Sequence, residues 1–512
     1  MSLRFVLPAL MLGTSALCGA ALAQPADEAV QAAESENILD DAEALAIDAK
    51  LYAREFGVPF EEALNRMTIM TYGGDVVSQE ASLEGADLAG RFYQNKSSDF
   101  GLTIATKKAA RADKSVSFTP RTKANYGRLN AAAMQERNAA RKALHQSAGL
   151  SDSEVRAAQA RLAAPVQVKV RYKTGQAHSL AELIAGKDAV VALASQYPEI
   201  NGASVDEIGN SVRIFATKAL SSDQIRDLQK QAGVPLQVDV LPGGFTATAN
   251  MRGGSKLYAS STATSSASRS CMTAFGARSN TLKTSTGAAL TGMVSAAHCS
   301  DTLHVIADTG ANMPLSVPAG HVSDTRGGAN QTDIQFMSGV NGNPAGLGTF
   351  YYDGTTNLRA VAGTQSRAGT AVGSGTAQSV GTGTAVGSYI CHLGQTSPGS
   401  TANMQSCGEV ISINASLSSN QPTSTAYYTG GSFVAVRNTS SGKGTVLGPT
   451  GTGTLRCYQG DSGGPWFAGT IAYGVQSWCA WENGVTNSDR AILVLYTSTD
   501  FFAQAGVSII VP

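Results

Sequence analysis

Apolar residues recur at helical spacing in the first third of the chain. In residues 41–67, leucine, isoleucine, tyrosine and phenylalanine return near every third or fourth position, with charged residues between them. This pattern is typical of an amphipathic helix. Residues 130–149 form a second helical stretch of this kind. We therefore predict that residues 24–165 are mostly helical.

The pattern changes to short alternating runs between residues 166 and 250. Apolar and polar residues alternate in 166–172, 211–218 and 234–241, which predicts strands. Residues 221–233 begin with a serine, carry an acid in the first turn and end at a glycine, as a capped helix does. This stretch is predicted to be a small α/β or α+β unit without an evident catalytic cluster.

Residues 251–512 contain no convincing long helix. Short alternating runs are broken there by Gly, Ser, Thr and Asn, which predicts an all-β sandwich or barrel. Composition changes at the same place, because only 22 of the 76 charged residues but 38 of the 55 glycines lie after residue 250. The chain is therefore expected to consist of two kinds of domain that meet near residue 250.

Charge and the N-terminus indicate where the protein acts. The formal net charge is zero and no long charge block occurs, which argues against nucleic acid or a basic membrane-binding surface. Residues 1–23 have the pattern of an export signal, with Arg4, an apolar run and an Ala-Leu-Ala cleavage site. No later stretch reaches the roughly 18–20 apolar residues of a membrane span. We expect a secreted protein, extracellular or periplasmic, without a membrane anchor.

The cysteines fit this expectation. Cys18 would leave with the signal, and six remain, all in the second half: Cys271, Cys299, Cys391, Cys407, Cys457 and Cys479. An even set in an exported protein indicates disulfides. No C-x-x-C pair occurs, so neither a metal site nor a redox site is expected.

Two short motifs carry candidate chemistry. Ser462 lies in "GDSGGPW" (460–466), and His298 lies in "GMVSAAHCS" (292–300), where an apolar strand end runs into small residues. A cysteine next to the histidine could fix that loop, as a general base requires. The nearby carboxylates are Asp301, Asp308, Asp324 and Asp333. Asp333 directly precedes an alternating apolar strand, whereas the other three lie in polar, turn-like contexts.

The order of these residues along the chain separates several hydrolase classes. "GDSGG" also matches the serine turn of α/β-hydrolases, but that fold places its histidine after the serine, and no histidine follows Ser462. The subtilisin order would need an acid from the charged first half. The order His298, Asp333, Ser462 is the chymotrypsin order.

With these motifs, residues 251–512 resemble the chymotrypsin-like serine proteases, specifically the secreted bacterial branch that includes α-lytic protease and the streptogrisins. "SAAHC", "TDIQF" and "GDSGGPW" look like the family's histidine, aspartate and serine motifs, and "GVQSWC" (474–479) like its substrate-binding strand. Residues 389–410 are similar to its small disulfide loop. The resemblance implies a double six-stranded β-barrel in residues 251–512 and a pro-region in residues 24–250.

The resemblance also implies a role for each matching residue. Ser462 would be the nucleophile, His298 the general base and Asp333 the group that orients the histidine. The N–H groups of Gly460 and Ser462 would form the oxyanion hole, and Asp461 would be an internal salt-bridge partner that shapes it. Ser477 and Trp478 would bind substrate. The implied disulfides are Cys271–Cys299, Cys391–Cys407 and Cys457–Cys479. No metal ion or organic cofactor is implied.

The pro-region would act on the enzyme domain of the same chain. We expect it to assist folding, to inhibit, and to be removed by a cut near residues 246–254. The expected product is a monomeric serine endopeptidase acting on proteins or peptides, without nucleic acid as a partner. The enzyme domain is longer than compact bacterial relatives, with the excess in the 340–450 region.

Departures from the family pattern keep other functions open. Cys479 follows Ser477 by two positions, which alters the wall of the specificity pocket, and Arg456 near its floor would favour acidic side chains. The alternative function is therefore a catalytically impaired, protease-like binding protein; an esterase is a third candidate, which the residue order disfavours. The remaining histidines of this half are predicted to be solvated or structural: His304, His321 and His392.

Overall fold

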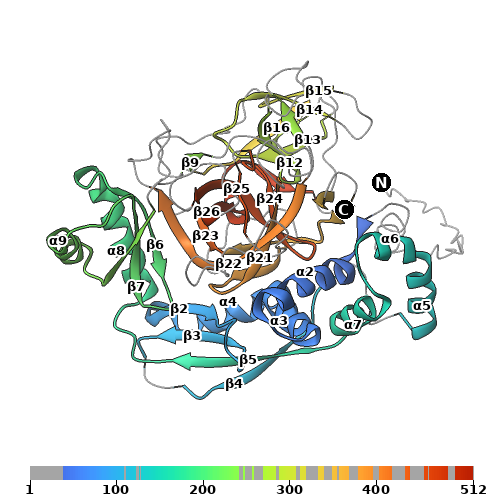
Figure 1. Ribbon diagram of the computed structural model, residues 1–512, viewed down its shortest axis with the longest axis horizontal. Coiled ribbons are helices and arrows are strands. Elements are labelled where there is room, and N and C mark those ends of the chain that lie inside the picture. Colours follow the sequence, from blue (N-terminus) through green and yellow to red (C-terminus); the bar gives the residue numbers. More distant parts are fainter. Residues whose placement is uncertain are drawn as a thin grey trace, which may run out of the picture.

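The arrangement of the chain is seen in a computed structural model (Figure 1). The predicted signal, most of the predicted cut site and His321 lie outside the residues that the structure describes. Within the described residues, no helix combines the length and apolarity needed to cross a membrane. The described residues are 38–108, 111–122, 126, 129–241, 246–247, 256–258, 269–283, 287–306, 312–318, 332–339, 349–353, 357–367, 379–395, 403–417, 433–438, 455–458, 460–481 and 491–510.

The C-terminal half contains a closed six-stranded antiparallel barrel (Figure 1). Each strand pairs with the next, and β24 pairs with β21 to close the ring. In order around the barrel, the strands are β21 (Tyr389–Gln395), β22 (Asn403–Leu417), β23 (Phe433–Arg437), β26 (Ala491–Ser498), β25 (Ile471–Trp481) and β24 (Pro465–Ala468). Trp466 is fully buried and stacks on Tyr496, with ring centroids 5.1 Å apart. This barrel carries the serine motif at the start of β24.

A second sheet of the same half carries the histidine motif. It runs as an eight-strand path whose two ends, β11 and β27, are not paired with each other among the described residues. The order is β11 (Arg269–Met272), β10 (Lys256–Tyr258), β14 (Thr302–Ile306), β15 (Asn312–Ser316), β16 (Gln335–Gly339), β13 (Ala289–Ser295), β12 (Gly276–Lys283) and β27 (Val507–Ile509). Of the two six-stranded barrels expected, the described strands therefore form one closed barrel. The other sheet is extended at its edge by the C-terminal strand β27, which pairs with β12.

The N-terminal helices follow the sequence pattern, with one break. The predicted helix over 41–67 is two helices, α2 (Asp41–Phe56) and α3 (Phe60–Tyr72). Gly57 ends α2 in the left-handed region with φ 63°, and Pro59 starts α3, as is usual for these residues at helix ends. The remaining helices of this part are α4 (Gly74–Ser82), α5 (Ala131–Ala140), α6 (Lys142–Ser147) and α7 (Asp152–Ala163).

The expectation that residues 24–165 are mostly helical missed a four-stranded sheet. Its order is β2 (Leu88–Tyr93), β3 (Leu102–Thr106), β5 (Val166–Lys173) and β4 (Lys114–Phe118). β3 is fully buried and β2 nearly so, and strands buried on both faces lack the alternation that marks a half-exposed strand. The alternation of residues 166–172 predicts a strand of the second unit, but this strand, β5, pairs parallel to β3 through a crossover that contains α5–α7.

The second N-terminal unit adds its own strands to the barrel. It consists of α8 (Leu180–Leu193), β6 (Ile200–Asp206), β7 (Ser211–Ala216), α9 (Ser222–Ala232) and β8 (Leu236–Val240). Ser221 caps α9 and Gly233 ends it, as predicted. β6 pairs with β22, so one sheet runs from this unit into the barrel. Lys187 of α8 also donates to the Ser416 hydroxyl of β22 at 2.8 Å.

Short strands complete the pairing between the two halves. β1 (Ile38–Leu39) lies parallel to β18 (Asn357–Ala360), which pairs with β17 (Thr349–Asp353). β9 (Thr246–Ala247) pairs with β25. β19 (Gly363–Arg367) lies between β25 and β20 (Ser379–Thr384).

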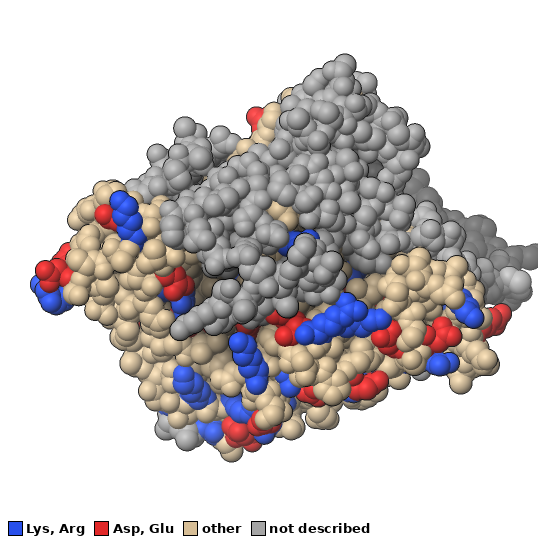
Figure 2. Space-filling model, viewed as in Figure 1, with Lys and Arg blue, Asp and Glu red and all other residues tan. Residues whose placement is uncertain are grey.

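On the face shown in Figure 2, positive and negative side chains intermingle along the N-terminal half, in keeping with the net charge of zero.

A buried acid makes the N-terminal helices sensitive to low pH. Glu43 is fully buried beside Arg141 and His145, whose side chains lie 2.6 Å from its carboxylate oxygens. Burial alone would raise the pKa of Glu43, but the hydrogen bonds from His145 and Arg141 lower it to about 2. Folding therefore favours the ionised form of Glu43. The resulting contribution to the free energy of unfolding is present above pH 4.5 and is lost as the pH falls toward 2.

We predict that Glu43→Gln abolishes part of the acid sensitivity of unfolding. In a Ser462→Ala chain, the contribution of Glu43 to the free energy of unfolding should fall by about 3 kcal/mol between pH 5.5 and pH 2. Denaturant unfolding at both pH values, with and without Glu43→Gln, measures this difference. The exposed Glu61 is the control site, and equal pH dependence in Glu43→Gln and Glu61→Gln would contradict the prediction.

Candidate active site

Strand pairing brings the histidine and aspartate motifs together. His298 lies in a turn three residues after β13, and Asp333 lies two residues before β16. β13 and β16 are antiparallel neighbours with Ser295 opposite Gln335, so both motifs lie at the same end of this strand pair. The Cys271–Cys299 disulfide ties the histidine turn to β11. The clamp expected from the cysteine next to the histidine is therefore present.

His298 lies between a carboxylate and a hydroxyl. Its Nδ1 is 2.8 Å from Asp333 Oδ2, and its Nε2 is 2.7 Å from Ser462 Oγ. The backbone N–H of His298 donates to Asp333 Oδ1 at 3.0 Å, which fixes the carboxylate relative to the ring. The structure thus brings together all three residues that the sequence singled out.

The electrostatics of this group determine the histidine tautomer. Burial favours the neutral form of Asp333, but attraction to His298 and the hydrogen bonds from its ring and backbone lower the pKa of Asp333 below its ordinary value. An ionised carboxylate only accepts hydrogen bonds. The His298 Nδ1 must therefore carry the proton toward Asp333, which leaves the Nε2 lone pair to accept the Ser462 hydroxyl.

The serine turn is held by close backbone contacts that exclude side chains. The Met272 N–H donates to the Ser462 carbonyl at 2.7 Å, and the Gly463 N–H donates to the Gln476 carbonyl at 2.8 Å. Gly463 has φ 87°, and a Cβ there would collide with the Met272 carbonyl oxygen. One glycine of the motif is therefore required by packing against the second sheet, a reason that local sequence does not reveal.

The residues before the serine form a tight turn. Gly460 has φ 124°, a conformation that favours glycine. Asp461 Oδ2 accepts the Tyr458 N–H at 2.9 Å, which links the carboxylate to the backbone of this turn. Asp461 is fully buried, and its expected role as an internal salt-bridge partner stays a prediction.

The two residues expected to bind substrate both lie beside the group formed by His298, Asp333 and Ser462. Ser477 is buried with its hydroxyl 3.0 Å from Thr497 Oγ1, and it also hydrogen-bonds to the Asp333 carboxylate. The Trp478 ring lies 5.4 Å from the His298 ring, and its backbone pairs with Ala247 of β9. Ser477 thus links the Asp333 carboxylate to Thr497. Thr497 carries no motif by which the sequence could have marked it.

The six cysteines pair as the resemblance implies. Cys391–Cys407 joins β21 to β22, and Cys457–Cys479 joins the segment before the serine to β25. Cys271, His298 and Cys299 place possible metal-binding atoms within 4.8 Å of one another. The two sulfur atoms are bonded to each other, so they offer no thiolate and this group does not suit a metal ion.

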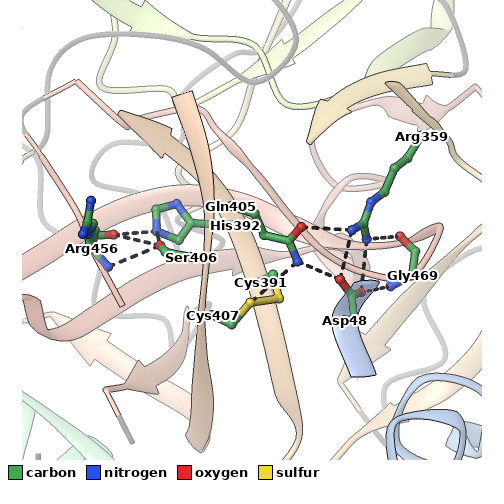
Figure 3. The surroundings of a disulfide bond; sticks show 9 residues. All are labelled: Asp48, Arg359, Cys391, His392, Gln405, Ser406, Cys407, Arg456 and Gly469. Carbon is green, nitrogen blue, oxygen red and sulfur yellow. Dashed lines mark hydrogen bonds and ion pairs between the residues drawn. A yellow bond between two sulfur atoms is a disulfide. The ribbon is translucent and has the colours of Figure 1, made fainter. Parts of the chain in front are cut away.

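The two other described histidines of this half lie within strands. His392 is buried, with Nε2 2.6 Å from the Arg456 carbonyl and 2.9 Å from Ser406 Oγ (Figure 3). Burial lowers the pKa of His392 to about 4, although the hydrogen bond to the Arg456 carbonyl acts in the opposite direction. His304 lies within β14, opposite Pro314 of β15. The Arg456 backbone is thus a structural element of the barrel.

Comparisons with known proteins give a distant structural likeness. No family model matches the sequence, and no curated protein matches it. A solved structure of a glutamic-acid-specific serine protease, reported to use a novel histidine triad in substrate binding, is 19% identical with a TM-score of 0.28. The match covers 51% of this chain and 100% of that chain.

Proposed function

We propose that this protein is a secreted serine endopeptidase that hydrolyses peptide bonds through an acyl-enzyme on Ser462. The observation that carries the proposal is the position of His298, whose two ring nitrogens lie within hydrogen-bond distance of Asp333 and Ser462. A hydroxyl is a weak nucleophile until a base removes its proton, and the base works when a third group holds its tautomer.

The proposed reaction uses these residues in two half-reactions. Ser462 Oγ attacks the carbonyl carbon while His298 Nε2 takes its proton, and Asp333 stabilises the resulting imidazolium. The N–H groups of Gly460 and Ser462 stabilise the negative oxygen of the tetrahedral intermediate. His298 then protonates the leaving amine as the peptide bond breaks. Water then attacks the acyl carbon while His298 takes its proton, and His298 returns this proton to Ser462 Oγ as the ester bond breaks and the acid leaves.

The N-terminal half is proposed to keep the enzyme inactive until it is removed. β9 pairs antiparallel with β25, with Ala247 opposite Trp478 and Thr246 opposite Cys479. By resemblance, β25 is the strand that pairs with the substrate backbone, so β9 occupies the place of a substrate. A cut near residues 246–254 would free this edge. The same half is proposed to assist folding, because its strand β6 extends the barrel sheet.

The test is labelling with a fluorophosphonate, which reacts with activated serines. Chains carrying an inserted site for a sequence-specific protease within 250–254 are folded, cut and labelled, with Ser462→Ala as the control. We expect stoichiometric labelling once the cut N-terminal half has dissociated from residues 251–512, none in the control and much slower labelling before the cut. Absence of labelling in folded residues 251–512 that have been separated from the N-terminal half would instead favour the catalytically impaired binding protein.

A further inference from the structure

The extra length of the enzyme domain includes a hairpin that contacts the N-terminus. β17 and β18 lie in the 340–450 region, and β18 pairs with β1 in parallel, with Ile38 opposite Leu358 and Leu39 opposite Arg359. The three strands form a sheet separate from both sheets of the enzyme domain. An extended segment of one half thus adds a strand to an edge supplied by the other, a common mode of peptide recognition.

Next to this edge, one carboxylate of α2 is enclosed by the enzyme domain (Figure 3). Asp48 accepts hydrogen bonds from Arg359 Nη1 at 3.1 Å and Nη2 at 3.0 Å, which makes a bidentate ion pair. It also accepts from Gln405 Nε2 at 2.7 Å and from the Gly469 N–H at 2.6 Å. All four donors come from residues 251–512. The enzyme domain therefore supplies a complete carboxylate site, and helix α2 supplies the carboxylate.

The arginine is prepared for this role by its own contacts. Arg359 is fully buried, donates to the Gly469 carbonyl at 2.9 Å and lies over the Phe467 ring at 4.9 Å. A planar guanidinium held in this way fits both oxygens of a carboxylate. A buried charge that loses its partner is strongly destabilising. Loss of Asp48 would leave the Arg359 cation and two other donors without the carboxylate.

The flanking residues of α2 extend the contact along one helical face. Asp41 accepts a hydrogen bond from the Thr470 hydroxyl, next to Gly469. The rings of Tyr52 and Phe56 lie 5.4 Å and 5.6 Å from the Tyr389 ring of β21, both edge-on. Spacings of three and four place 41, 45, 48, 52 and 56 on one face. This surface of residues 251–512 therefore fits an amphipathic helix with an acid at its centre and aromatic residues after it.

We propose that the β17–β18 hairpin, with Gln405 and Gly469, is a receptor for residues 38–56 of the same chain, with Asp48 as its anchoring residue. This contact holds the cut N-terminal half on the enzyme domain, and its dissociation sets how fast the enzyme is released. The inference rests on the proposed division of the chain into a pro-region and an enzyme.

The test measures dissociation after a controlled cut. Full-length Ser462→Ala chains with an inserted protease site within 250–254 are folded, cut and followed by size-exclusion chromatography after dilution. We expect the wild-type interface to remain associated and Asp48→Asn to dissociate about 30-fold faster or more. Asp48→Asn leaves the enzyme domain unchanged. The control is Asp152→Asn, a change at an exposed acid in the first turn of α7, which should dissociate as the parent does.

A second variant tests the direct contact from the enzyme side. Arg359→Lys keeps the charge but removes the bidentate hydrogen bonding to Asp48. It should also speed dissociation of the cut N-terminal half. Combined with Asp48→Asn, it should add far less than the product of the two single effects, because both remove one interaction. Equal dissociation rates for Asp48→Asn and Asp152→Asn, or multiplying effects of the two variants, would overturn the proposal. Since these chains lack Ser462, the result is independent of the labelling test.

Discussion

Asp333→Asn is expected to lower kcat for peptide hydrolysis by about 10⁴-fold while leaving the fold intact. In the unchanged chain, the His298 backbone N–H donates to Asp333 Oδ1 at 3.0 Å. The side-chain carbonyl of the asparagine can still accept this hydrogen bond. Its amide group would then face His298 Nδ1 as a donor, so Nδ1 could no longer carry a proton. The proton would move to Nε2, which could not accept the Ser462 hydroxyl.

The control for this variant is another acid near the histidine. Asp301 is one of the four candidate carboxylates near His298, and it is exposed. Asp301→Asn should therefore retain kcat within a small factor. Steady-state kinetics on a peptide substrate, with circular dichroism to confirm folding, compares the two. A fall of less than tenfold in folded Asp333→Asn would argue against the role proposed for this carboxylate.

The candidate site could be predicted largely from the sequence because its parts have local signals. His298 and Ser462 lie in short motifs of glycine, small residues and cysteine. Asp333 was distinguished from three other acids by the apolar strand that follows it. That strand, β16, pairs with β13, which ends just before His298. The context that favoured Asp333 in the sequence is therefore the same feature that positions it in space.

The contacts between the two halves could not be predicted in this way. Asp48 and Arg359 are 311 positions apart, and periodicity within a window of about 11–18 residues carries no information on such pairs. In the sequence, Asp48 is an ordinary polar position of an amphipathic helix. Its burial depends on residues 251–512, which cover that face of the helix. The strand pairings of β1, β6 and β9 with the barrel half arise from the same long-range assembly.

The missed strands of the N-terminal half have a related cause. β2 and β3 are continuous runs in which nearly every residue is buried, so the two-residue period is lost. β5 alternates clearly and was predicted, but its neighbours β3 and β4 are supplied by earlier parts of the chain. Local pattern thus identified the strand and placed it in the wrong unit, because unit membership depends on pairing.

Residues 251–512 alone are expected to refold far more slowly than the full chain. Residues 251–512 are built from strands that pair across long sequence separations, and such pairing is slow to form. In the full chain, β6 aligns β22 through the pairs Ala415–Ser204, Ser416–Ala203 and Leu417–Gly202. If such contacts contribute about 3 kcal/mol to the folding transition state, their loss slows refolding about 100-fold.

The experiment compares recovery after denaturant dilution with disulfides intact. Residues 251–512, cut and purified, are refolded in one reaction, and the full-length chain is refolded in a parallel reaction. The full-length chain is then cut, and labelling with fluorophosphonate counts the folded molecules in both reactions. Equal recovery rates would contradict a folding role for the N-terminal half. Slow recovery by itself leaves open which contacts matter, so a variant in the N-terminal half is also needed.

Gly202→Ala provides that variant without changing the enzyme domain. A Cβ at Gly202 would approach the Ser416 carbonyl oxygen to 2.7 Å, so β6 and β22 would have to separate. Gly175→Ala is the matched control, because Gly175 has φ 71° but open space around it, so it reports backbone strain alone. We expect Gly202→Ala to slow refolding of the full chain and Gly175→Ala to leave the rate nearly unchanged. Equal rates would mean that β6 joins β22 only after the rate-limiting step, and the folding role would then belong to other contacts between the halves.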